Sequence, residues 1–115
     1  MTLRTLMMIL WLLPALAVAA PQVALNEQSH QDYLTADKAL NEAYGRLMDK
    51  LSPERRQKLK TAQRAWLRFR DAQAELVSSA WQGGSLQPLA HSEELKRLTE
   101  HRTQELEQQW RAENR

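Results

Sequence analysis

Few side chains in this sequence have the types and spacing that catalysis requires. The three histidines, His30, His91 and His101, form no i, i+4 pair that would place two metal ligands on one helix face, and the chain has neither an HExxH motif nor a cysteine. Ser85 follows two glycines, but its surroundings lack the Lys-Ser/Thr of a phosphate-binding loop and the pattern of a nucleophile elbow. The sequence therefore predicts a binding protein without a catalytic site, metal or cofactor, not an enzyme.

A line of basic residues is the most distinctive charged feature. Arg56, Lys60, Arg64 and Arg68 recur at intervals of four, so they lie along one side of a helix. One interpretation is a solvated face that oppositely charged parts of the protein partly neutralise. The alternative is a surface that holds anionic envelope polymers. With 16 basic and 14 acidic residues the net charge is only +2, which does not favour a nucleic-acid partner.

The first 19 residues have the organisation of an export signal. One arginine precedes an uncharged apolar run at residues 6–13, and Ala17 and Ala19 supply the small residues of a cleavage site. The apolar run is shorter than the roughly 20 residues that cross a bilayer, so no stable membrane anchor is expected. We predict a cleaved signal peptide at residues 1–19 and a single periplasmic domain at residues 20–115.

The apolar residues of this domain recur at helical spacing, with almost no β-branched runs. A first helix is predicted from about Asn26 to Leu51. Ser52 is the N-cap expected of a second helix, which Pro53 begins and which extends to about Trp81. Its inner stripe is predicted to be Leu59, Ala62, Trp66, Phe69, Gln73, Leu76 and Ala80.

Two glycines, Gly83 and Gly84, are expected to end the second helix because they adopt left-handed backbone conformations at little cost. They open a loop that covers residues 82–90. Ser92 is the predicted N-cap of a third helix, and Arg102 lies on the predicted inner stripe of that helix.

Three helices joined by one short and one longer link predict an all-α fold. The expected architecture is a small antiparallel bundle, or a helical hairpin with the third helix packed across it. In this arrangement Arg102 points inward and requires a carboxylate or several carbonyls around it, and Asp71 or Asp37 can supply the carboxylate. Trp66 and Phe69 are both expected to be buried.

The second predicted helix carries the residues of a family resemblance. The run at residues 60–73, which includes Trp66, Phe69, Arg70 and Asp71, resembles the central motif of the lysozyme-inhibitor LprI-like N-terminal domain family of small exported bacterial proteins. Upstream, an aspartate, a Leu-Asn pair and a tyrosine are similar to the family pattern. Downstream, the Gly-Gly-Ser and Leu-Thr motifs follow in the same order. We expect these motif residues to hold the fold and not to contact a partner, because Trp66 and Phe69 lie three apart on the inward stripe.

The resemblance also implies a partner and reveals one departure. A lysozyme or related muramidase is the implied target, and its acidic cleft would receive the loop that carries the candidate binding residues Trp81, Gly83, Gly84 and Ser85. An ordinary interhelical connection is the alternative role for this loop. Family members usually have cysteines where this chain has Gln28, Ala74 and Glu94, so disulfide-held rigidity is not expected in this chain.

Overall fold

The computed structural model describes the backbone of residues 2–115 and the side chains of residues 20–115. In this part of the chain, helix α1 spans Thr2–Lys50, α2 spans Pro53–Ser78, a short 3-10 helix η1 spans Ser79–Trp81, and α3 spans Gln87–Glu113. No residue between 2 and 115 belongs to a strand. The predicted all-α class is therefore confirmed.

The predicted signal peptide, residues 1–19, lies outside the residues whose side chains the structure describes. Within the described part of the chain, none of the helices has a stretch that is both long and apolar enough to cross a membrane.

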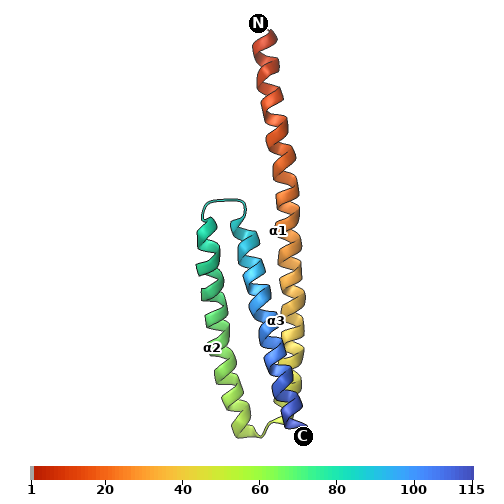
Figure 1. Ribbon diagram of the computed structural model, residues 1–115, viewed down its shortest axis with the longest axis vertical. Helices are drawn as coiled ribbons and strands as arrows, with labels where there is room; N and C mark the ends of the chain where they lie inside the picture. Colours follow the sequence, from red (N-terminus) through yellow and green to blue (C-terminus); the bar gives the residue numbers. More distant parts are fainter. Residues whose placement is uncertain (1) are drawn as a thin grey trace.

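The three long helices are aligned lengthwise (Figure 1). Helix α2 runs antiparallel to α1, and α3 runs antiparallel to α2, so that α1 and α3 point in the same direction. Helix α3 packs against both of the others, most extensively against α1. It lies along the other two helices, in the three-helix architecture that the sequence predicts.

The break between α1 and α2 follows the predicted local signals. Ser52 has an extended backbone (φ −62°, ψ 159°), and its hydroxyl accepts a hydrogen bond of 3.4 Å from the backbone N–H of Arg55. Pro53 occupies the first turn, where its missing N–H costs nothing. Arg55 also donates hydrogen bonds to Glu113 at the end of α3, and these hold the pKa of the Glu113 carboxyl below its usual value. This contact joins the start of α2 to the end of α3.

Helix α3 begins earlier than the sequence predicts. It starts at Gln87 and not after Ser92, so the loop between the helices is limited to residues 82–86. Pro88 falls in the first turn, where proline fits a helix start, so it belongs to the helix and not to the loop. The predicted cap, Ser92, is instead a buried residue inside α3, with 6% of its surface exposed.

The hydrophobic core is a compact leucine cluster to which all three helices contribute. Its buried members are Leu40, Ala43, Leu47, Leu51, Leu59 and Leu106, and the half-buried side chains packed against it are Tyr44, Met48, Trp66 and Trp110. Among residues 20–115, every buried residue lies between positions 29 and 106. A chain that starts at Ala20 therefore retains the whole described core.

The predicted inner stripe of α2 is wrong at several positions. The buried residues of α2 are Leu59, Gln63, Arg70, Ala74 and Ser78. Phe69 and Leu76 are exposed over 54% and 66% of their surface, and Ala62 and Ala80 are exposed as well. The physical reason is that α1 and α3 supply polar partners for Arg70 and Gln63, while small side chains such as Ala74 allow the helices to approach closely.

Candidate functional site

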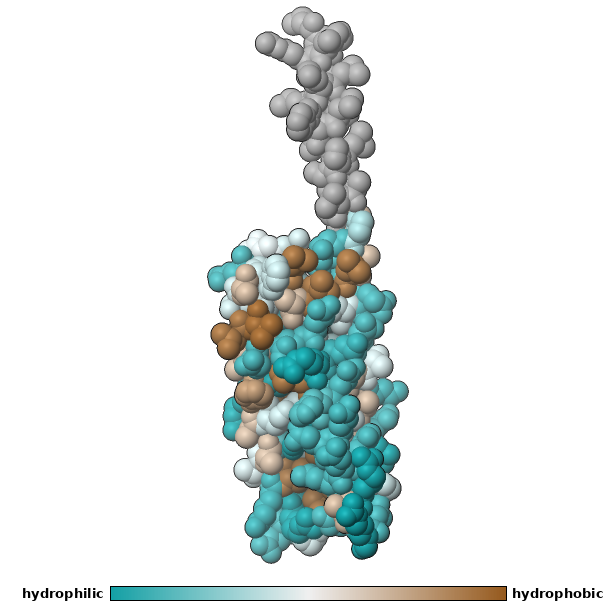
Figure 2. Space-filling view, viewed as in Figure 1, coloured by the Kyte–Doolittle hydropathy of each residue, from teal (hydrophilic) through white to brown (hydrophobic). Residues whose placement is uncertain are grey.

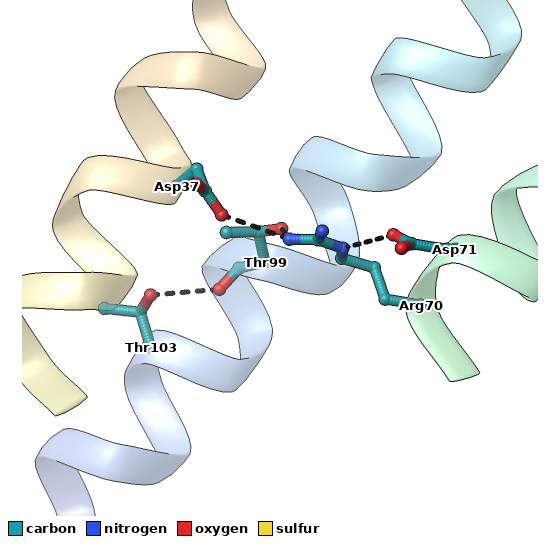
Figure 3. A network of polar contacts seen from close by, with 5 residues as sticks. All are labelled: Asp37, Arg70, Asp71, Thr99 and Thr103. Carbon is teal, nitrogen blue, oxygen red and sulfur yellow. Dashed lines mark hydrogen bonds and ion pairs between the residues drawn. The ribbon is translucent and has the colours of Figure 1, made fainter. Parts of the chain in front are cut away.

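A buried guanidinium joins all three helices (Figure 3). Arg70 of α2 donates from Nη1 to Asp37 Oδ1 of α1 at 3.1 Å and to Thr99 Oγ1 of α3 at 3.5 Å, and from Nε to Asp71 Oδ1 at 3.0 Å. Only 8% of the Arg70 side chain is exposed. The hydroxyl of Thr103 donates to the Thr99 carbonyl at 3.0 Å. The resulting network sets the register of the helices.

Two aromatic rings complete the surroundings of Arg70. The guanidinium carbon lies 5.4 Å from the ring centroid of Tyr33 and 5.4 Å from that of Trp66. Burial raises the pKa of the Tyr33 hydroxyl above its usual value. Burial alone would lower the pKa of Arg70, but its hydrogen bonds to Asp71 and Asp37 and the nearby negative charges raise it overall. Hydrogen bonds and ion pairs of this cluster link the three helices, and a structural role for the motif residues stays a prediction.

The predicted ion pair between Asp71 and Arg102 is wrong. Arg102 donates from Nε to Gln63 Oε1 at 3.0 Å, approaches Glu105 at 3.5 Å and lies over the Trp66 ring at 6.0 Å. Asp71 pairs with its neighbour Arg70 and keeps 65% of its side chain exposed. Arg102 points inward as predicted, with 11% of its side chain exposed. Asp37 and Asp71 instead pair with Arg70, which the sequence did not place on the buried face of α2, because only packing determines which carboxylate each guanidinium reaches.

The histidines are held as ordinary surface residues. His91 Nε2 lies 3.3 Å from a Glu75 oxygen, and His101 Nδ1 lies 3.2 Å from a Glu105 oxygen. Within the described residues, no group of three or more His, Asp or Glu side chains is placed to hold a metal ion.

The basic line lies on the surface of α2. Arg56, Arg64 and Arg68 are exposed, and Lys60 is half-buried. Arg56 donates from Nε to the Met48 carbonyl at 3.0 Å, which ties the start of α2 to the end of α1. Among residues 20–115, none of these four cations lies within ion-pair distance of a carboxylate. Binding of anionic polymers by this line stays a prediction.

The four candidate binding residues of the loop lie together between η1 and the start of α3. Trp81 is 49% exposed, and Gly83, Gly84 and Ser85 are exposed. We call Trp81, Gly83, Gly84, Ser85 and the neighbouring Leu86 the loop surface.

The loop has a defined backbone. Gly83 has a φ of 77°, the left-handed conformation predicted for it. The Gly84 N–H donates to the Trp81 carbonyl at 3.0 Å, and the Gly83 N–H donates to Gln87 Oε1 at 3.3 Å. Asn26 Nδ2 of α1 donates to the Ser85 carbonyl at 3.1 Å, so the loop is also fixed to the first helix.

Large apolar side chains are exposed around the same end of the bundle. Seven such residues occur in residues 20–115, and their positions along α1, α2, η1 and the loop place them in the half of the bundle that contains the loop. They are Val23, Leu25, Leu34, Phe69, Leu76, Trp81 and Leu86. On the face drawn in Figure 2, several brown side chains lie toward this end. By contrast, Trp110 packs against the core and lies under Arg46 and Lys50. The loop end therefore combines the loop surface with exposed apolar side chains.

Replacement of Gly83 tests the loop backbone directly. An alanine there would meet no atom within 4 Å, so the cost comes from the left-handed φ alone. We expect Gly83→Ala to lower the free energy of unfolding by about 1 kcal/mol. Gly45→Ala in α1 is the matched control, since its added Cβ also meets no atom, and it should raise stability by about 0.5–1 kcal/mol. Chemical denaturation of both variants checks the opposite signs, and equal effects would contradict them.

The positions at which the family resemblance implies cysteines differ widely in their surroundings. Ala74 is fully buried, Gln28 is exposed and donates to Asp32 at 2.9 Å, and Glu94 pairs with Arg97. The chain has no cysteine, so packing and the Arg70 network stabilise the bundle without a covalent link.

Comparison with known proteins places the chain in a family. The family model described as lysozyme inhibitor LprI matches residues 16–106. The chain is also 35% identical, over 103 residues, to an uncharacterized protein of Rhizobium meliloti (strain 1021), in an alignment that covers 78% of this chain and 74% of the relative. No solved structure matches the chain. The matched span includes the Arg70 network and the loop surface, and the chain belongs to the lysozyme inhibitor LprI family.

Proposed function

We propose that this chain is a periplasmic protein that binds a lysozyme or related muramidase, and that the loop surface contacts the catalytic cleft of that enzyme. Membership of the lysozyme inhibitor LprI family supports the class of target. The loop surface is proposed as the contact site because Trp81 is exposed beside the left-handed Gly83, at the end of the bundle where apolar side chains are exposed. Export through residues 1–19 would bring the chain into the compartment where such enzymes act.

The loop suits a cleft that contains carboxylates. Glycosidases of this class place two acidic residues at the scissile bond. The segment from Ser79 to Leu86 contains no charged residue, so it approaches these carboxylates without repulsion. The Ser85 hydroxyl and the Gln82 amide can donate hydrogen bonds to them. Helix α3 has no acidic residue in its first turn and no side-chain N-cap, which leaves its positive dipole end directed at the same place.

Preorganisation supports tight binding by this loop. Its backbone hydrogen bonds and the contact from Asn26 already hold it in one conformation. A loop fixed before binding loses less conformational entropy when the complex forms. Trp81 offers a large, rigid side chain, of the type that often dominates binding energy.

Trp81→Ala is expected to weaken inhibition of a sensitive lysozyme at least tenfold, because a central tryptophan in an interface contributes on the order of 2 kcal/mol or more. The measurement is the lysis of bacterial cells by several lysozyme classes, with the chain from Ala20 added at rising concentration. Trp81 is half exposed and lies outside the core, so the variant should melt within a few degrees of the parent.

Arg68→Ala is the matched control, since Arg68 is exposed on α2 and lies outside the loop surface. Its inhibition should equal that of the parent. If the parent protects cells from none of the lysozyme classes at micromolar concentration, the proposal is wrong. If Arg68→Ala abolishes protection while Trp81→Ala keeps it, the basic line is the contact surface and the loop is not.

A further inference from the structure

An apolar stripe on the outer side of α2 has no partner within the described part of the chain. Its residues alternate at spacings of three and four, the pattern by which two helices pack side by side. They are Ala62, Ala65, Phe69, Ala72 and Leu76 of α2, followed by the polar Ser79 at the start of η1, and all six are exposed. We call this set the α2 seam. Phe69 and Leu76 are among the most exposed large apolar residues of the described chain.

We propose that the α2 seam joins two copies of this chain in an antiparallel homodimer. A two-fold axis that crosses the seam between Phe69 and Ala72 places Phe69 of each copy against Ala72 of the other. The same register places Leu76 against Ala65. Each large side chain then meets a small one, which is how facing helix positions fill space without voids.

The charges beside the seam favour the same register. Arg68 and Glu75 are seven residues apart, so they lie on the same edge of the seam. In an antiparallel pair, this edge of one copy faces the same edge of the other copy, and the two run in opposite directions. Arg68 of each copy therefore lies next to Glu75 of the other. Arg68 is exposed and has no carboxylate within ion-pair distance among residues 20–115. The Glu75 side chain is 74% exposed.

This self-complementarity is specific to a second copy. An isologous two-fold interface requires one patch to match itself, and the α2 seam does so in both shape and charge. Glu75 lies 3.3 Å from His91 of its own chain. A parallel pair would place Arg68 near Gln73 and Glu75 near Ala80, so neither would gain an opposite charge from the other copy. In the antiparallel pair the two loop surfaces lie about 30 Å apart along the helix axis and at opposite ends, so each stays accessible.

The decisive experiment reverses the charges one at a time and then together. Because one helix face buries less area than a standard interface, we expect a dissociation constant on the order of 10–100 µM for the chain from Ala20 in analytical ultracentrifugation. Arg68→Glu or Glu75→Arg alone creates two like-charge contacts and should raise this constant at least tenfold. The double variant restores both pairs and should return it to within about threefold of the parent.

The rescue cannot arise within one copy, since residues seven apart on a helix do not contact each other. Lys38→Glu, an exposed charge reversal on α1, is the control and should leave the dimer unchanged. Phe69→Gln with Leu76→Gln should abolish it, and both residues are exposed enough for the monomer to keep its fold.

Three outcomes would overturn the proposal. One is a chain that sediments as a monomer at every concentration tested. Another is a dimer that survives Phe69→Gln with Leu76→Gln, or that the double charge reversal fails to restore. The third is a monomer in which Phe69→Gln abolishes lysozyme inhibition, because the seam would then bind the enzyme and not a second copy. The first two outcomes are measured by sedimentation without a lysozyme, so the dimer can fail while the proposed function holds, and the reverse.

Discussion

Leu106→Ala is expected to lower the free energy of unfolding by about 3–4 kcal/mol. Leu106 has no exposed surface and lies in the cluster formed by Leu40, Leu47 and Leu59, where α3 meets the other helices. The substitution removes buried apolar surface and leaves a cavity that rigid helices fill only partly. A small domain has only about 5–15 kcal/mol of stability, so much of it would be lost.

Urea denaturation monitored by circular dichroism measures this loss. Leu25→Ala on α1 makes the same chemical change at a side chain that is 55% exposed, and it should cost less than about 1 kcal/mol. Equal losses at the two positions would mean that the leucine cluster is not the core of the protein.

We expect Asp37→Ala to lower the free energy of unfolding more than Arg70→Met, the substitution that removes the positive charge Asp37 neutralises. Asp37→Ala leaves the nearly buried guanidinium of Arg70 with Asp71 as its only carboxylate partner among the described residues, at an expected cost of about 2–3 kcal/mol. Arg70→Met keeps the volume of the side chain and removes the buried charge. The carboxylates left behind are 33% exposed at Asp37 and 65% exposed at Asp71, so water can solvate them, and the cost should be about 1 kcal/mol.

Thermal melts of both variants, with Asp71→Ala alongside, rank the three partners. The exposed Asp71 should matter least, since ion pairs at the surface contribute under about 1 kcal/mol. A larger loss for Arg70→Met than for Asp37→Ala would show that the network stabilises the bundle through its ion pairs and not merely by avoiding an unpaired buried charge.

Local chemistry decided where the chain turns, and the sequence predicted these places. Ser52 and Pro53 mark the start of α2 because a hydroxyl cap and a proline satisfy a helix N-terminus whatever surrounds it. Gly83 adopts the left-handed conformation that other residues resist. Because the two glycines predict a loop and loops lie at the protein surface, the exposure of the loop residues was predictable as well. The start of α3 was not, because Pro88 is compatible with a loop and with a first helical turn.

Which face of α2 is buried was decided only by the tertiary structure. Two stripes of this helix are plausible from sequence, and the one with Phe69 and Leu76 is the more apolar. The helix instead buries Arg70 and Ala74, because Asp37 and Thr99 arrive from helices distant in sequence to satisfy the guanidinium. Periodicity identifies a helix from the spacing of its own residues. The cost of burying a charge depends on partners that other helices bring to it, and this spacing contains no information about them.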